Sequence, residues 1–421
     1  MGWLLAIATL GLTYPYAIYP LLLVAATRLF ARPVAASADF PPVAILVSAF
    51  NEEGRILDKI TNFEALDYPP DRIEMWIGTD GSMDRTAEIV REANHARVHL
   101  VERSQRSGKT AVLNDLASRA KAGIFVFTDA TGHFRPDAVR LLATPFADPR
   151  VGLVSGRALI RKGEGNVAVE GAYYRLDSWM KDREGSCGWL AGALGPIYAL
   201  RASLYHDLPQ EYINDLAHPC QVAAAGFDAR FEPRAVSEEP AGDHAGREFD
   251  RQTRIAAQAS YLLSRECWIL LRKRRWGMLW ALISHKWLRW VAGIWIPLGW
   301  IALAGLSPAL AAAALVPLAL VVLGWRAGAG WAAIPMFFII VHCAYLNGLW
   351  RALAGDRYLR WLPAVLTPVF LLVMYIPAAA AFFEMKALNP VQWGWVLGVT
   401  VLGCVGMWLT DYVARQRGRE G

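Results

Sequence analysis

Apolar and polar positions divide the chain into three parts. Residues 1–30 are apolar and carry no charge before Arg28. Residues 38–262 alternate short apolar runs with amphipathic stretches, a pattern typical of a water-soluble domain. Most of residues 287–413 is apolar again. This order indicates a membrane protein with a soluble insert.

Short apolar runs, each followed by an amphipathic stretch, open the soluble part. The runs predict strands at residues 43–50, 73–78, 98–103 and 124–130, with helices at 52–66, 84–94 and 109–120 between them. Strands alternating with helices favour an α/β fold, with a mostly parallel sheet covered on both faces. Ligands of such sheets bind beyond the carboxyl ends of the strands. This rule selects the polar groups at Asn51–Glu53, Asp80 and Asp129–Thr131.

The N-terminal apolar segment is long enough to cross a bilayer, since about 20 residues suffice. A cleaved signal peptide is the alternative, with a cleavage site at Val34–Ala38, but the segment lacks a basic start and its apolar core is too long. Arg28 and Arg32 follow the segment. By the positive-inside rule we therefore expect residues 1–30 to be a transmembrane anchor and the soluble domain to be cytoplasmic.

Residues 263–286 are rich in Trp and basic side chains and predict an amphipathic region at the membrane interface. Further apolar stretches lie near residues 288–306, 308–325, 331–350, 362–383 and 394–413. Counting each as a span gives six with the anchor. Five spans, with residues 285–300 lying flat, fit the charge rule better because the basic tail 414–421 is then cytoplasmic. Either count, with four or five helices in 287–413, predicts a multi-pass protein of a bacterial-type inner membrane.

The amino-acid composition further narrows the class of protein. The chain of 421 residues is 55% hydrophobic and contains 18 Trp, which exceeds an ordinary soluble composition. Its formal net charge is +6, but the basic residues form no long tract interleaved with aromatics, so nucleic acid is not an expected partner. The five Cys are scattered and predict neither a disulfide framework nor a zinc site.

Asp129 is the first candidate for chemistry. It follows four apolar residues in "FTDATGHF" and is therefore expected at the mouth of the sheet. A carboxylate there suits a Mg²⁺ or Mn²⁺ ion that bridges the phosphates of a nucleotide, since these cations prefer oxygen ligands. A carboxylate that only caps a turn or helix is the alternative.

A series of motifs runs in one order through the soluble part. They read "VSAFNEE", "TDGSMDRT", "GKTAVLN", "FTDATGHF", "GPIYALR", "INDLAHPCQVAAAGFDARFEP" and "EFDRQTRIAAQ". The series resembles the inverting, membrane-bound family 2 glycosyltransferases, a group that includes cellulose, chitin and hyaluronan synthases and exopolysaccharide transferases. The likeness covers residues 43–258 and extends more weakly to "SHKWLRW" at Ser284. It implies a GT-A domain, a Rossmann-like and mostly parallel sheet, joined to an all-α transmembrane region.

The resemblance also implies roles for single residues. Asp215 would be the catalytic base that takes the proton of the acceptor hydroxyl; capping the helix that follows is its alternative role. Asp129 would hold the divalent cation, and Lys109 would neutralise phosphate charge unless it is a solvated surface lysine. The expected donor site comprises Ala49, Asn51, Glu52, Asp80, Lys109, Asp129 and Arg254.

The chain departs from the family pattern at several positions. Where processive synthases carry Gln-x-x-Arg-Trp, Arg251 replaces the Gln and Ile255 replaces the Trp. We therefore expect transfer of one or a few sugars, with Arg251 and Trp189 as candidate acceptor contacts; Trp189 is equally suited to a core. Thr131 stands where many relatives have a second metal-binding acid. Thr79 replaces the first acid of the loop that usually reads Asp-Asp-Gly-Ser, a change expected to affect base selectivity.

Together these observations predict a glycosyltransferase. It would transfer a sugar from a nucleotide-diphosphate donor, expected to be a UDP-sugar, to a lipid-linked or saccharide acceptor. We expect the reaction to take place at the membrane, in contact with membrane lipids, and to serve polysaccharide or glycolipid synthesis. A processive synthase is one alternative. A sugar nucleotidyltransferase is disfavoured because no Gly-rich phosphate loop follows the first strand. A nucleotide-regulated transport protein is disfavoured because few charges lie in the apolar stretches.

Overall fold

The computed structural model describes residues 1–35, 37, 40–160, 167–240 and 245–353. The predicted spans near 362–383 and 394–413, and the predicted tail 414–421, lie outside these residues. All elements below belong to one compact unit, residues 1–359.

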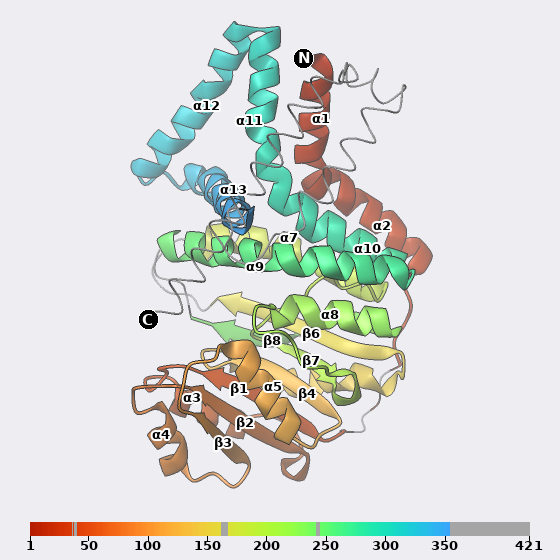
Figure 1. The fold of residues 1–421 in the computed structure, drawn as a ribbon, viewed down its shortest axis with the longest axis vertical. Coiled ribbons are helices and arrows are strands. Elements are labelled where there is room, and N and C mark those ends of the chain that lie inside the picture. Colours follow the sequence, from red (N-terminus) through yellow and green to blue (C-terminus); the bar gives the residue numbers. More distant parts are fainter. Residues whose placement is uncertain (36, 38–39, 161–166, 241–244, 354–421) are drawn as a thin grey trace, which may run out of the picture. The chain divides into compact units, whose positions relative to one another are not determined.

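One eight-stranded sheet organises the soluble part (Figure 1). Its order is β3-β2-β1-β4-β7-β6-β8-β5. The first four strands in this order are parallel, as predicted, whereas β7 is antiparallel to both β4 and β6. The strands are β1 (Val43–Ala49), β2 (Ile73–Asp80), β3 (Val98–Arg103), β4 (Ile124–Asp129), β5 (His133–Phe134), β6 (Val151–Ile160), β7 (Tyr198–Arg201) and β8 (Asp228–Glu239).

Register brings the carboxyl ends of the parallel strands to one edge. Ala49 at the end of β1 pairs with Thr79 of β2, and Ser48 pairs with Asp129 at the end of β4. Asp80 pairs with Arg103 at the end of β3. The loops that follow β1, β2 and β4 therefore begin side by side, as the sequence predicts.

Helices cover both faces of the sheet, as the alternating pattern predicts. On one face, α3 (Ile56–Glu64), α4 (Thr86–Ala93) and α6 (Ala138–Ala143) bury apolar side chains in the same cluster as Ile45 and Ile77. On the other face, α5 (Lys109–Arg119) and α8 (Asn214–Ala225) pack against Leu46 and Phe127. Three single-turn helices join these elements: η2 (Pro70–Arg72), η3 (Thr144–Ala147) and η4 (Ala202–Leu204).

Two long helices connect the sheet to the apolar helices. In Figure 1, α7 (Val167–Ser186) and α9 (Ala245–Arg272) lie between them. α7 contacts β8 and the N-terminal α2, whereas α9 contacts α8 and the apolar α13. The helix α9 ends at Arg272, so residues 263–272 of the expected interfacial region are the end of a helix that starts in the expected soluble domain, and the rest of that region follows α9.

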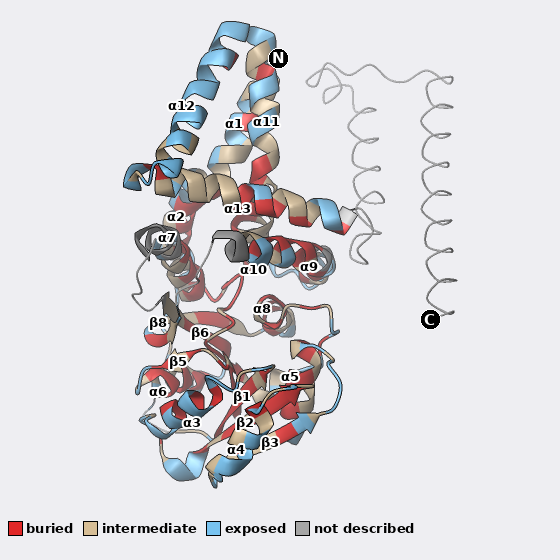
Figure 2. Cartoon of the chain, turned by 90° about the vertical axis from the view of Figure 1, so that its left-hand side faces the viewer, coloured by how far each residue is buried: buried red, intermediate tan, exposed pale blue. Residues whose placement is uncertain are grey.

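Four helical stretches of the described residues are long and apolar enough to cross a membrane: residues 2–30, 276–306, 308–326 and 330–352. In Figure 2, α12 is mainly exposed, and its exposed side chains include Leu315, Leu320 and Leu323. An exposed helix of this composition is suited to contact with lipid. The elements are α1 (Gly2–Thr13), η1 (Tyr14–Ile18), α2 (Tyr19–Phe30), α10 (Trp276–Ala281), η5 (Leu282–Trp287), α11 (Leu288–Leu306), α12 (Pro308–Arg326) and α13 (Gly330–Leu353).

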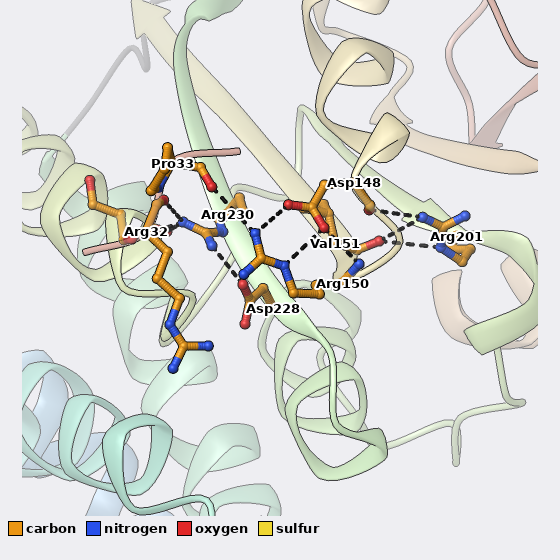
Figure 3. Close-up of polar contacts among 10 residues, drawn as sticks. Arg32, Pro33, Asp148, Arg150, Val151, Arg201, Asp228 and Arg230 are labelled. Carbon is orange, nitrogen blue, oxygen red and sulfur yellow. Dashed lines mark hydrogen bonds and ion pairs between the residues drawn. The ribbon is translucent and has the colours of Figure 1, made fainter. Parts of the chain in front are cut away.

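Arg230 of β8 ties the end of the N-terminal helices to the soluble domain (Figure 3). Its buried guanidinium donates to the carbonyl oxygens of Arg32, Gly185 and Ser186 at 3.1, 3.1 and 2.8 Å. It also donates to Asp228 Oδ2 at 2.6 Å. The backbone N–H of Arg32 donates to Ser186 at 3.0 Å. One side chain therefore closes the carboxyl end of α7 and holds the segment that leaves α2.

Arg230→Met is expected to lower the free energy of unfolding by about 2 kcal/mol, because it leaves the half-buried Asp228 carboxylate without this partner and removes one donor from each of three carbonyl groups. Thermal unfolding of the detergent-solubilised protein, followed by Trp fluorescence, measures the effect. Arg234→Met is the control, since Arg234 is exposed and its ion pair in the described residues is with Glu232 of the same strand. Equal melting temperatures for the two variants would contradict the proposed fastening role.

Candidate active site

The loops after β1 and β2 are hydrogen-bonded to each other. Asn51, in the left-handed region at φ 54°, accepts the N–H of Met83 at 2.9 Å. The N–H of Glu52 donates to Thr86 Oγ1 at 2.8 Å. Asp84 accepts the N–H of Thr86 at 3.1 Å, at the start of α4. These bonds leave the Glu52 carboxylate half-buried, and burial raises its pKa.

Asp80 positions the next loop. Its Oδ1 accepts from the N–H and the hydroxyl of Ser107 at 2.6 and 2.9 Å, and its Oδ2 accepts the N–H of Gly108 at 2.8 Å. Gly108, at φ +90°, directly precedes Lys109 at the start of α5. Asp80 thus fixes where Lys109 leaves the loop. The adjacent Thr79 is 2% exposed and alternates to the opposite face of β2, so it does not share the surroundings of Asp80.

Lys109 and Asp129 form an ion pair at the strand ends. Lys109 Nζ lies 2.5 Å from Asp129 Oδ1. Burial alone would raise the pKa of Asp129, but Lys109, Lys59 and Arg254 together lower it below the usual value. Burial would likewise lower the pKa of Lys109, yet Asp129 and Asp215 raise it. Both groups are therefore charged at neutral pH, and Lys109 is not a solvated surface lysine.

Two charged residues that the sequence analysis missed lie beside this pair. The buried Lys59 of α3 donates to Thr128 Oγ1 and to the carbonyl oxygen of Gly132, at 2.9 and 2.5 Å. Burial lowers the pKa of Lys59 to about 8, although Glu239 and Asp129 oppose the shift. Glu239, at the end of β8, accepts from Thr131 Oγ1 at 3.2 Å. The only sequence signal was the acidic pair "EE" closing a strand; Lys59 reads as one more polar position of an amphipathic helix.

The donor atoms at this edge suit a hard divalent cation. Asp129, Thr131 and Glu239 offer carboxylate and hydroxyl oxygens, the ligands that Mg²⁺ and Mn²⁺ prefer. Glu239 approaches Thr131, the position at which the chain lacks a second acid. Among the described residues no three or more His, Cys, Asp or Glu gather as a metal-binding group. A cation would therefore be held by few protein ligands and complete its shell with diphosphate and water.

Asp215 lies in the first turn of α8, whose N-cap residue is Ile213. The alternative reading, in which Asp215 caps this helix, is therefore wrong. No hydrogen bond or ion pair to its carboxylate occurs within the described part of the chain. Burial raises the pKa of Asp215, whereas the charges of Lys109, Lys181 and Lys286 oppose the shift. A half-buried carboxylate with a raised pKa and no partner has the properties of a general base.

The remaining predicted contacts are spread more widely. Arg254 of α9 acts electrostatically on Lys109 and Asp129, so it belongs to the same charged site. Arg251 lies one turn earlier on α9 and is exposed. Trp189 packs against Phe30 and Trp280, with ring centroids 5.3 and 6.4 Å apart. The ring of Trp189 is thus in contact with the membrane-proximal helices, and an acceptor role for it stays a prediction.

His218 belongs to a buried hydrogen-bond network that fixes the start of α8, the helix that carries Asp215. Its Nδ1 is 3.0 Å from the hydroxyl of Tyr198, which accepts from Asn214 Nδ2 at 2.6 Å. Burial lowers the pKa of His218 to about 3, so the ring is neutral. The residue before Asp215 is thereby fixed to β7 by a buried network, which holds the start of α8 against the sheet.

Comparison with known proteins agrees with this arrangement. Residues 44–201 match the Glycosyl transferase family 2 domain. This part of the chain therefore resembles a family 2 glycosyltransferase domain. The match runs from β1 to β7 and includes Asp80, Lys109 and Asp129, whereas Asp215 and Arg254 follow it.

Relatives of the glycosyltransferase domain are known from several bacteria. A beta-monoglucosyldiacylglycerol synthase of Synechocystis sp. is 30% identical over 171 residues, which are 38% of this chain and 35% of that protein. The probable glycosyltransferase YdaM of Bacillus subtilis is 25% identical over 215 residues, 47% of this chain and 50% of YdaM. The chain thus spans no more than half the length of these relatives.

A solved structure extends the likeness of fold beyond the domain. The mannosyltransferase PcManGT from Pyrobaculum calidifontis, in complex with GDP-Man and Mn²⁺, aligns with a TM-score of 0.63 at 24% identity. The alignment covers 82% of this chain and 99% of that structure. The GT-A fold predicted for the glycosyltransferase domain is confirmed, and the four apolar helical stretches are able to form the transmembrane region.

Proposed function

We propose that the protein is an inverting glycosyltransferase of a bacterial-type inner membrane, with its catalytic domain on the cytoplasmic side. It takes a sugar from a nucleotide-diphosphate donor, foremost a UDP-sugar, and transfers it to a lipid-linked or saccharide acceptor. The observation that carries the proposal is the carboxylate of Asp215, which has no hydrogen-bond or ion-pair partner in the described part of the chain and is coupled electrostatically to the Lys109–Asp129 pair at the strand ends. The relatives named as glucosyldiacylglycerol synthases favour glycolipid synthesis as the setting.

The proposed reaction is a single displacement. Asp215 accepts the proton of the acceptor hydroxyl as its oxygen bonds to the anomeric carbon, and the bond from that carbon to the diphosphate oxygen breaks on the opposite side. Lys109 and Arg254 neutralise charge on the departing diphosphate. Asn51 and Glu52 line the nucleoside side, and Asp80 holds the loop that presents Lys109.

A divalent cation is the proposed cofactor, held by Asp129 with Thr131 and Glu239. When bound, it supplies positive charge to the diphosphate as the glycosidic bond breaks. The Lys109–Asp129 ion pair keeps Asp129 ionised before donor and cation bind. Arg251 and Ile255 stand where processive synthases carry Gln and Trp, and neither has an aromatic ring on which a sugar could stack. We therefore propose addition of one or a few sugars.

A panel of UDP- and GDP-linked sugars tests this function. The full-length protein in detergent micelles, supplied with Mn²⁺ and membrane lipids, is expected to release UDP from at least one UDP-sugar faster than from any GDP-sugar. Products from radiolabelled donor are expected to run as short glycolipids. GDP-mannose belongs in the panel because the structural neighbour was solved with it. No nucleotide release from any donor would contradict the proposed activity, and a high-molecular-weight polymer would contradict the short product.

A further inference from the structure

A group of charged side chains is buried where α7 meets η5 and α11. His285 of η5 contacts Glu184 through Nδ1 at 2.6 Å and Asp177 through Nε2 at 2.9 Å. Asp177 also accepts from Arg289 at 3.1 Å and pairs with Lys181 at 2.8 Å. The two acids of α7 are thus shared among three basic side chains.

Lys286, next to His285, interacts electrostatically with Asp177 and Glu184 of this network but is not in direct contact with them. Within the described residues its ammonium makes no hydrogen bond and no ion pair. The residue lies in the stretch 276–306, which is long and apolar enough to span a membrane. A cation in such a segment without a carboxylate in contact is costly to maintain, and this cost is typical of functional positions.

The side chain of Lys286 reaches the loop that also contacts the proposed base. A Cβ atom placed on Gly192 would lie 3.0 Å from Lys286 Cε and 3.5 Å from Nζ. A Cβ atom placed on Gly195 would lie 3.0 Å from Asp215 Oδ2. Between the two glycines, the N–H of Ala193 donates to the carbonyl oxygen of Asp215 at 2.8 Å. A short glycine-containing loop therefore adjoins both the Lys286 ammonium and the Asp215 carboxylate.

Three lysines act electrostatically on Asp215; Lys181 is paired with Asp177, and the other two come from different sides. Lys109 belongs to the donor site at the strand ends, whereas Lys286 comes from η5, which continues into the apolar α11. An acceptor lipid held along η5 and α11 would meet Lys286 beside the loop that adjoins Asp215. The ammonium matches an anionic group on that acceptor, close to the hydroxyl that Asp215 deprotonates.

We propose that Lys286 binds the phosphate of an anionic lipid acceptor, one in which a phosphodiester lies within a few bonds of the reacting hydroxyl. This inference rests on the proposed function and specifies the acceptor of the same site. The acceptor oxygen bonds to the anomeric carbon, its proton passes to Asp215, and the nucleoside diphosphate leaves with the electrons of the broken bond. The phosphate on Lys286 takes no part in bond making and sets which lipid is held.

Lipid binding and transfer by the full-length protein in nanodiscs test this inference. Phosphatidylglycerol carries a phosphodiester beside its hydroxyls, and diacylglycerol carries a hydroxyl without charge. Lys286→Met is expected to weaken phosphatidylglycerol binding, measured by native mass spectrometry, about 10- to 100-fold and to leave diacylglycerol binding within twofold. In transfer assays the variant should raise the KM for the anionic lipid more than it lowers kcat.

Lys273→Met is the control, because it removes one exposed charge from the interfacial basic cluster and should change binding of either lipid less than twofold. Lys286→Arg, which keeps the charge, should restore most of the binding and serves if the Met variant fails to fold. Equal losses in Lys286→Met and Lys273→Met, or wild-type preference for diacylglycerol, would overturn the inference. Nucleotide release by the wild-type protein separates that result from failure of the glycosyltransferase function.

Discussion

Asp215→Asn is expected to lower kcat for sugar transfer about 100- to 10,000-fold, the range that a positioned general base contributes. The amide has nearly the shape of the carboxylate but takes up no proton from the acceptor hydroxyl. Because no hydrogen bond to the Asp215 carboxylate occurs in the described residues, its replacement disturbs little of the fold. Donor affinity should stay within about threefold, since Lys109 and Asp129 are unchanged.

The pH dependence gives an independent reading of the same group. Burial raises the pKa of Asp215 above that of an ordinary aspartate. A base acts only in its ionised form, so kcat/KM should fall as the pH drops through this raised pKa and should be constant above it. In Asp215→Asn this acidic limb should disappear from the residual rate.

Initial rates of nucleotide release with saturating acceptor measure the loss, and equilibrium binding of the donor measures affinity. Asp207→Asn is the matched control, since Asp207 is exposed and the change removes the same charge. A kcat for Asp215→Asn within tenfold of the control would show that another group accepts the proton.

The parts of the site that the sequence could predict are those fixed by local pattern. Apolar runs ending in Asp80 and Asp129 predict acids at strand ends, and parallel register then brings them to one edge. Helix starts follow similar local rules, but the sequence alone does not place Asp215: it lies inside the first turn of α8, two residues after the N-cap residue Ile213.

The parts that the sequence could not predict depend on pairings between distant segments. Lys59 lies on an amphipathic helix, where a lysine is normally solvated, and only the fold of the β4–β5 loop over α3 buries it. Glu239 reaches Thr131 because β8 runs antiparallel to β5, a partner 100 residues earlier, with Glu238 opposite His133. The pattern of apolar and polar residues within either strand does not predict which distant strand it will pair with.

The residues proposed to face the acceptor also depend on contacts between distant segments. The motif position of Trp189 predicts a contact with the acceptor, but packing against Phe30 and Trp280 decides where its ring lies. Lys286 carried no signal beyond a weak continuation of the likeness. The proposed role of Lys286 depends on which cations the acids of α7 contact. These contacts are made between distant segments and cannot be predicted from the sequence.

Asp129→Asn should have the second large effect, lowering affinity for Mn²⁺ at least about 30-fold and kcat about 1,000-fold. The carboxylate is the central anion of the proposed cation site, and an amide is a far weaker ligand for a hard cation. The change also leaves Lys109 without its ion-pair partner and removes an anion that supports the charge of Lys59. The two side chains of this pair are 38% and 36% exposed, so Lys109 should turn toward other acceptors and water, and donor binding should weaken as well.

Electron paramagnetic resonance of free and bound Mn²⁺ gives the affinity without relying on turnover, and thermal unfolding shows whether the variant is folded. Asp58→Asn is the control, because Asp58 is an exposed acid on the same helix as Lys59. Glu239→Gln should give a smaller loss of Mn²⁺ affinity, about 3- to 10-fold. Asp129 is the central ligand of the proposed site, whereas Glu239 comes from the end of β8 and contacts the hydroxyl of Thr131. If chelator-treated wild-type protein retains full turnover, Lys109 and Arg254 alone support the leaving diphosphate. In that case Asp129 serves only to orient Lys109, and the loss in Asp129→Asn should match that of Lys109→Met.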